Sequence, residues 1–92
     1  MADDETYLLL YTYVDDMAER RGPHREAHLA AIRAEREAGR ITMGGALGTA
    51  PTGAAIVWTG VTPDQIEDFA AADPYVVNGL VTSRRIERWN LV

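Results

Sequence analysis

The distribution of hydrophobic and polar positions divides the chain into six regular segments joined by short connections. Continuous or alternating apolar runs predict strands at 7–14, 41–47, 54–59 and 80–91. Helical spacing predicts helices at 23–38 and at 63–72 or 63–73, and the segments between predict loops or turns at 15–22, 48–53 and 74–79. The order β-α-β-β-α-β predicts an α+β fold, a ferredoxin-like antiparallel sheet with both helices on one face.

Two helices leave the other face of such a sheet uncovered. That face would carry several large apolar residues of the first and third strands, too many for a soluble monomer. We therefore expect a homodimer in which the sheet faces of two copies pack together. The large apolar residues of that face are expected to be several of the following: Tyr7, Leu8, Leu9, Leu10, Ile56, Val57 and Trp58.

The start of the second helix is marked by Thr62, Pro63 and Gln65, which fit an N-cap, the first helical position and a capping box. Within that helix, Asp73 lies seven residues after Ile66 and so falls on the apolar face. A carboxylate buried at the negative end of a helix dipole requires a partner, and such groups concentrate at functional sites. The alternative is a solvent-exposed Asp that favours a turn at the following Pro.

The first helix carries alanines at helical spacing, which predict a narrow buried stripe lying close on the sheet. His28 lies on the edge of this arc, where it would be partly buried at the margin of a cleft. It is either a boundary histidine satisfied by backbone or water, or the partner of Asp73 across the two helices. The alanines of the stripe are Ala27, Ala31, Ala34 and Ala38.

Composition narrows the class of protein. The 92 residues suffice for a single domain, 1–92, and 47% of them are apolar, as in a globular fold. The net charge is −5 and all nine basic residues are Arg, which disfavours a nucleic-acid partner. No apolar run approaches the roughly 20 residues of a membrane span. The acidic start of the chain is unlike a signal peptide, so we expect a cytoplasmic protein.

The available residue types restrict the chemistry. The chain has no Cys, its single serine is Ser83 and it lacks a Gly-x-Ser-x-Gly motif, so covalent acyl transfer is disfavoured. A carboxylate bonded to one ring nitrogen of His28 would fix its tautomer and leave the other nitrogen to exchange protons near neutral pH. Arg25 is a candidate to hold an anionic substituent, and Tyr75 is a candidate to donate to an oxyanion. The alternatives are a solvated Arg25 and a Tyr75 that packs over the core.

Two further features bear on a ligand site. Gly44 and Gly45 in the second strand indicate a bulge or a close approach, and the missing side chains leave room for a ligand or the neighbouring helix. His24 and His28 share one helical face and with Asp73 would form a three-ligand metal set, but the Glu of a His-Glu-x-x-His motif is lacking. We therefore expect neither a metal nor another cofactor.

These residues also form a pattern that resembles a known family. Arg25-x-x-His28-Leu29, Gly39-Arg40 before the strand with Gly44-Gly45, and Ala72-Asp73-Pro74-Tyr75-Val76 followed by Gly79 are similar to the YciI-like (YCII-related) family. The resemblance covers 7–91 and implies the dimeric α/β-barrel superfamily, with an active site centred on His28 and Asp73. A few similar proteins act on chlorinated or hydroxylated aromatic rings and eliminate a leaving group.

The favoured hypothesis is a small-molecule enzyme in which His28 and Asp73 act as a general acid–base pair. Elimination or isomerisation of a small aromatic or enol-like substrate, a lyase-like reaction, fits these groups best. The alternative is a non-catalytic module for small-ligand binding or dimerisation, in which the His–Asp pair is structural.

Overall fold

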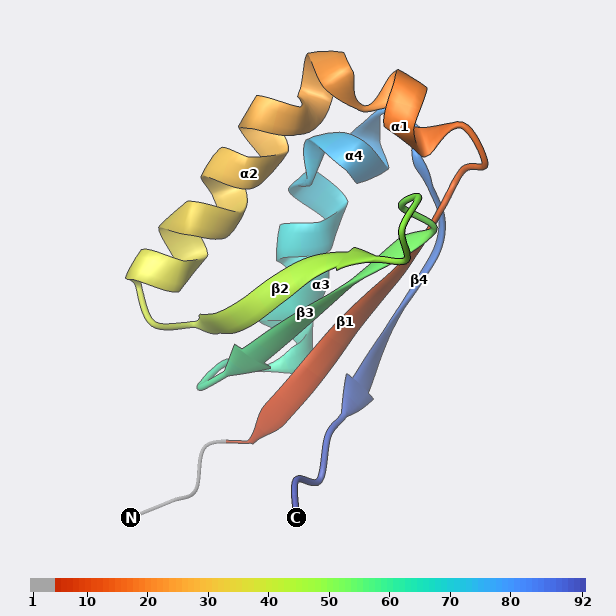
Figure 1. Cartoon of the computed structure of the whole chain (residues 1–92). Helices are drawn as coiled ribbons and strands as arrows, with labels where there is room; N and C mark the ends of the chain where they lie inside the picture. The colour runs from red at the N-terminus through yellow and green to blue at the C-terminus, as the bar shows by residue number, and fades with distance from the viewer. Residues whose placement is uncertain (1–4) are drawn as a thin grey trace.

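The computed structural model describes residues 5–92, so the acidic residues 1–4 that argue against a signal peptide lie outside it (Figure 1). Strands and helices follow one another along the chain and are joined by short connections, as the sequence pattern predicts. The elements are β1 (Thr6–Tyr13), α1 (Met17–Arg20), α2 (Gly22–Glu37), β2 (Ile41–Leu47), β3 (Gly53–Thr59), α3 (Pro63–Ala72), α4 (Pro74–Val77) and β4 (Val81–Arg88).

The strands form one antiparallel sheet in the order β2-β3-β1-β4. In the centre of the sheet, Leu9 of β1 lies opposite Ile56 of β3 and Ile86 of β4. The helices α2 and α3 lie on the same side of the sheet (Figure 1). The predicted α+β, ferredoxin-like architecture with both helices on one face is therefore confirmed. Among residues 5–92, no helix is both long and apolar enough to cross a bilayer.

Two short helices occupy segments in which the sequence predicted only loops or turns. α1 lies within 15–22, where the fully buried side chain of Met17 anchors a polar segment to the core. α4 lies within 74–79, because Asp73 and Pro74 act as an N-cap and a first helical residue. β4 is shorter than predicted, since its pairing with β1 ends where Arg88 lies opposite Tyr7.

The buried face of α2 differs from the prediction. His28 is only 7% exposed, whereas Ala27, Ala34 and Ala38 are exposed. The helix is therefore rotated so that His28 faces the core in place of the alanine stripe. Burying an alanine methyl group gains about 0.8 kcal/mol, and in the observed orientation His28 instead reaches the buried Asp73 and bonds to it.

Alternate residues of the central strands point to opposite faces of the sheet. Leu9, Ile56 and Trp58 belong to the core on the helix side, where the Trp58 ring meets Phe69 of α3 edge-on at 5.0 Å. Four of the candidates for the uncovered face, Tyr7, Leu9, Ile56 and Trp58, therefore lie on the helix side instead. Alternation explains the division, because Tyr7 pairs with Trp58 and Leu9 with Ile56, so these four side chains share one face.

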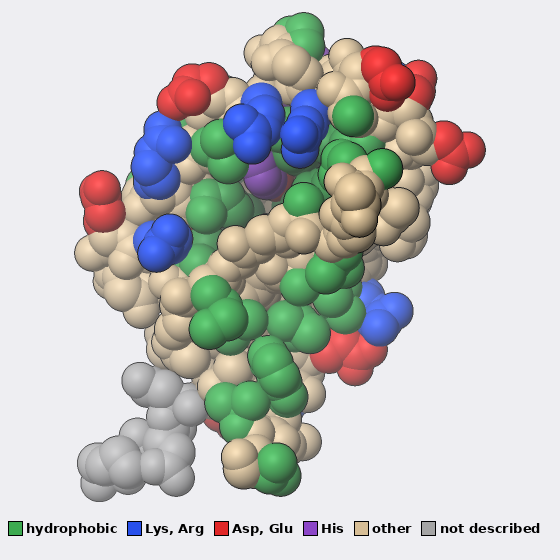
Figure 2. Space-filling model, in the orientation of Figure 1, with side chains coloured by type: hydrophobic (Ala, Val, Ile, Leu, Met, Phe, Trp, Pro, Cys, Tyr) green, Lys and Arg blue, Asp and Glu red, His purple; other side chains and the backbone are tan. Residues whose placement is uncertain are grey.

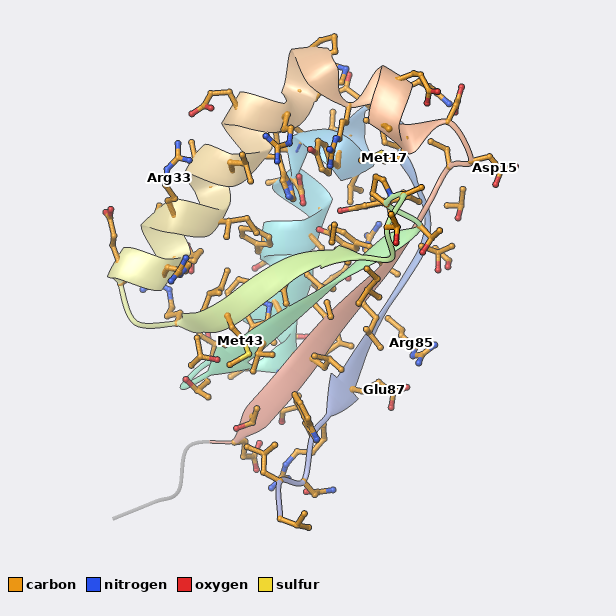
Figure 3. The ribbon with its side chains drawn as sticks, viewed as in Figure 1. Asp15, Met17, Arg33, Met43, Arg85 and Glu87 are labelled. Atoms are coloured by element: carbon orange, nitrogen blue, oxygen red, sulfur yellow. The ribbon has the colours of Figure 1, made fainter. Side chains whose placement is uncertain are left out.

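The uncovered face is apolar along its centre. Leu8 lies opposite Val57, and Leu10 follows one alternation later on the same side. At the neighbouring edge strand Met43 is 63% exposed and Leu47 is 45% exposed. Figure 2 shows hydrophobic surface over these strands, and Figure 3 shows charged side chains of β4 along the margin.

Candidate active site

Asp73 joins two helices at the centre of the candidate site. α3 ends at Ala72, the backbone of Asp73 is extended, and α4 begins at Pro74. The Asp73 carboxylate accepts a hydrogen bond from the backbone N–H of Tyr75 at 3.0 Å. A carboxylate is disfavoured at the C-terminal end of α3, and this N-cap hydrogen bond to the next helix offsets that cost.

Three donors converge on the Asp73 carboxylate, and the residue is 1% exposed. Besides the N–H of Tyr75, the Tyr11 hydroxyl donates to Oδ2 at 2.8 Å, and Nδ1 of His28 lies 2.8 Å from Oδ1 and 3.0 Å from Oδ2. An ionised carboxylate can only accept, so the arrangement places a proton on Nδ1. The predicted contact between His28 and Asp73 is confirmed, and the alternative of a solvent-exposed Asp is wrong.

The imidazole of His28 is held both at its edge and on its face. Its ring stacks on that of Tyr75 with centroids 3.8 Å apart and planes inclined by 10°. Nε2 of His28 bonds to no described residue. If it were buried, it would be a buried nitrogen without a partner, but among residues 5–92 only Trp58 Nε1 is of that kind. Solvent therefore reaches Nε2 of His28. With the proton on Nδ1, neutral His28 presents an unprotonated nitrogen there, the form needed in a general base.

Three tyrosines near the pair stay protonated at neutral pH. Burial, followed by the charge of the nearby carboxylate, raises the pKa of Tyr11 far above its ordinary value. Burial likewise raises the pKa of Tyr13. Burial raises the pKa of Tyr75 against the opposing effect of Arg21 and Arg25. All three hydroxyl groups can therefore act as hydrogen-bond donors.

A cavity of about 170 Å³ opens beside the imidazole, between α2 and the edge strand β2. Two guanidinium groups, two phenols and the imidazole supply its polar lining, and no described Asp or Glu borders it. In Figure 2, arginine side chains stand beside a hollow in which histidine surface is visible. The apolar lining consists of Leu29, Ile32, Ala46, Ala54 and Ile56.

Comparison with known proteins assigns the family. Residues 6–90 match the model of the YCII-related domain. The chain belongs to this family. A solved structure similar to this YCII-related protein is 5-chloro-2-hydroxyhydroquinone dehydrochlorinase from Burkholderia phenoliruptrix AC1100, in complex with 2,5-dihydroxybenzoquinone. The two are 23% identical with a TM-score of 0.81 over 95% of each chain, which establishes a shared fold. No curated protein sequence is significantly similar.

The cavity of this YCII-related protein brings together the residues that the sequence singled out. Asp73 lies behind the imidazole and does not border the cavity itself. The cavity therefore has the imidazole of His28 at its wall, and the carboxylate that binds this ring lies in the layer beneath. The predicted residues that line it are Arg25, His28, Gly44, Gly45 and Tyr75.

The two glycines form part of the cavity wall, but the expected bulge lies earlier in β2. The pairing register with β3 shifts between Ile41 and Met43. A Cβ at Gly44 would lie 3.4 Å from Ile56, and one at Gly45 would meet nothing within 4 Å. Gly44 lies opposite Ile56 on the helix side of the sheet, so its missing side chain enlarges the cavity. Gly45 lies opposite Ala55 on the same face as Leu10, so it borders the cavity through its backbone alone.

Three residues of the site were not predicted: Tyr11, Tyr13 and Arg21. The alternation of β1 indicates that both tyrosines share a face, but contact with Asp73, 62 residues after Tyr11, depends on the assembled sheet. Arg21 was assigned to a loop, whereas it is the residue before α2. Its spacing from Arg25, four residues, is the signal that places the two side chains on one helical face.

His24 does not join the site. It is half-buried in the first turn of α2 and does not line the cavity. Within residues 5–92, no group of three or more His, Cys, Asp or Glu residues is placed to hold a metal ion. The ligand set of His24, His28 and Asp73 that was considered from the sequence is therefore not formed.

Proposed function

We propose that this protein is a small-molecule enzyme in which His28 and Asp73 form a general acid–base pair. The reaction class that fits is elimination or isomerisation of a small aromatic or enol-like substrate. The observation that carries the proposal is the position of the His28 ring, whose Nδ1 is bound by the buried Asp73 while the ring borders a cavity. A histidine oriented in this way can exchange a proton near neutral pH.

The residues around the cavity have complementary roles in such a reaction. Nε2 of His28 takes a proton from the substrate, and the Asp73 carboxylate stabilises the imidazolium that results. The hydroxyls of Tyr13 and Tyr75 are donors available to an oxygen on which negative charge develops. In an elimination the leaving group departs with its bonding electrons, and in an isomerisation the imidazolium returns the proton to another atom of the substrate.

The size of the cavity supports a substrate with a single ring. An apolar cavity of roughly 150 Å³ holds one benzene molecule. The cavity beside His28 has about 170 Å³ and an opening to solvent, which suits one ring with a few substituents. The structural neighbour was solved with a single-ring quinone, and its name describes dehydrochlorination of a hydroquinone. That likeness supports the same class of substrate.

Turnover in deuterated water tests the proposal. A panel of chlorinated and hydroxylated single-ring compounds with and without a carboxylate, beginning with 5-chloro-2-hydroxyhydroquinone, would be assayed for chloride release and for incorporation of deuterium. His28→Ala should lower the rate by at least about 100-fold. His24→Ala removes the other imidazole of α2, outside the cavity, and should keep the wild-type rate. Absence of turnover across the panel, or equal rates in the two variants, would favour the non-catalytic ligand-binding module.

We also propose that the protein is a homodimer through its uncovered sheet face. Leu8, Leu10 and Val57 share that face with Met43 and Leu47, and apolar patches of this kind mark interaction sites. A two-fold axis would bring the same patch of a second copy onto it. Light scattering should give twice the chain mass of 10.1 kDa, and Leu10→Arg should give a monomer. A monomeric wild type at micromolar concentration would contradict the dimer.

A further inference from the structure

The lining of the cavity has a pronounced excess of positive charge. The chain contains 14 Asp and Glu residues against nine Arg, yet Arg21 and Arg25 border the cavity and no described carboxylate does. The hydroxyls of Tyr13 and Tyr75 add two neutral donors. The cavity lining therefore offers several hydrogen-bond donors and two positive charges, and no described carboxylate balances those charges.

Arg21 and Arg25 also differ from most arginines of the chain in having no described ion-pair partner. Arg33, for example, pairs with Glu26 and projects from the outer side of α2 (Figure 3). Arg36 likewise has no described partner, but it lies near the end of α2, away from the cavity. The arginines that pair with a described carboxylate are Arg20, Arg33, Arg40, Arg84, Arg85 and Arg88.

The two guanidinium groups act on the same part of the cavity. Arg21 precedes α2 but has helical backbone angles, and Arg25 follows four residues later, so the two side chains lie one above the other at the start of the helix. Both charges act on the Tyr75 hydroxyl, where they oppose the rise in its pKa caused by burial, and Arg21 acts in the same way on Tyr13. Like charges at this spacing repel each other, and an anion held between them would remove the repulsion.

We propose that Arg21 and Arg25 bind a carboxylate, so that the cavity selects single-ring carboxylic acids. A carboxylate is ionised at pH 7, whereas a simple phenol, with a pKa of about 10, is not. Guanidinium forks match the two oxygens of a carboxylate, and a pair of them fixes its orientation. The ring then lies beside His28, against the apolar lining that includes Leu29 and Ile32. The identity of this ligand as the substrate rests on the proposed function, whereas its binding does not.

Calorimetric titration with benzoate and with benzamide tests the inference, because the two probes share a shape and differ in charge. The wild type should bind benzoate more tightly than benzamide by about tenfold or more. Arg21→Gln and Arg25→Gln should each weaken benzoate binding by about tenfold or more, and the double variant should bind the two probes equally. Arg36→Gln removes the same charge from the same helix outside the cavity and should leave both affinities unchanged. Thermal melting verifies that each variant is folded.

Several outcomes would overturn the inference. Equal affinity of the wild type for the two probes would do so, as would absence of benzoate binding at millimolar concentration or an equal effect of Arg36→Gln. The test of carboxylate binding can also fail or succeed independently of the test of the proposed function. Benzoate binding without turnover of any ring compound would contradict the acid–base function and leave the ligand class intact. Turnover of neutral phenols without benzoate binding would contradict the ligand class alone.

Discussion

Replacement of Asp73 provides a quantitative test of whether the buried pair serves stability or chemistry. Asp73→Ala leaves three buried donors without an acceptor: the Tyr11 hydroxyl, Nδ1–H of His28 and the backbone N–H of Tyr75. Each unsatisfied donor costs about 1–3 kcal/mol, and a tautomer change can relieve the imidazole. We expect a loss of about 3–5 kcal/mol in the free energy of unfolding. A domain of this size is stable by about 5–15 kcal/mol, so the variant would lose a substantial part of its stability.

Asp73→Asn changes the charge and keeps the shape. The amide oxygen can still accept from Tyr75 and from Nδ1 of His28, and the amide nitrogen can donate to the Tyr11 oxygen. We therefore expect a loss of about 1 kcal/mol in stability. The rate should nevertheless fall by about 10²–10⁴, because an amide neither stabilises the imidazolium nor enforces the tautomer with Nε2 free.

Urea unfolding followed by tryptophan fluorescence measures the stability term, since Trp58 is buried in the core. Turnover of a substrate from the ring-compound panel measures the rate. The decisive comparison is the rate of Asp73→Asn under conditions where the variant is fully folded. Full activity there would refute the catalytic interpretation. Equal destabilisation by Asn and Ala, with a rate that follows the folded fraction alone, would assign the pair a structural role.

Three further predictions concern stability. Tyr11→Phe should cost about 1 kcal/mol in urea unfolding, because Asp73 keeps two other donors; a loss as large as that of Asp73→Ala would contradict this. The raised pKa of Tyr11 and Tyr13 predicts that melting temperature falls as pH rises above about 10. Above about pH 10 the two phenols ionise in the unfolded chain but not in the folded protein, which favours unfolding. The stability that their raised pKa contributes is therefore complete below that pH and is lost above it; a melting temperature that does not change with pH would be evidence against this prediction. Met17→Ala should cost about 2–5 kcal/mol by the urea assay, unlike Glu19→Ala on the exposed side of α1.

The fold was predictable because its signals are local. Strand and helix periodicities follow directly from the sequence, and the start of α3 is specified within four residues. The backbone N–H of Gln65 donates to Oγ1 of Thr62 at 3.2 Å, and the Gln65 side chain accepts from the Thr62 N–H at 2.8 Å. Such a capping box specifies the start of the helix through local hydrogen bonds alone.

The features that local signals did not reveal depend on tertiary contacts. α1 escaped prediction because one apolar residue, Met17, holds it in place. The face of α2 was misassigned because hydrophobic periodicity treats a buried histidine as polar surface, while alanines carry little apolar area. The contact of His28 with Asp73 was predicted from two inward-facing polar positions, but the contact of Tyr11 with the same carboxylate required the register of the sheet.

The polar groups of the site follow an order from the core to the cavity: a carboxylate, an imidazole and then positive charge. The acceptor, Asp73, is the deepest group, and Tyr11 and His28 bind it from the core and from α2. Buried charge of this kind is often replaceable by apolar packing at no cost in stability, so stability alone does not explain its presence. On the far side of the imidazole, the cavity carries donors and two guanidinium groups that pair with no carboxylate of residues 5–92. A carboxylate behind the ring and positive charge in front of it would poise His28 to take a proton from an anionic ligand held at the arginines.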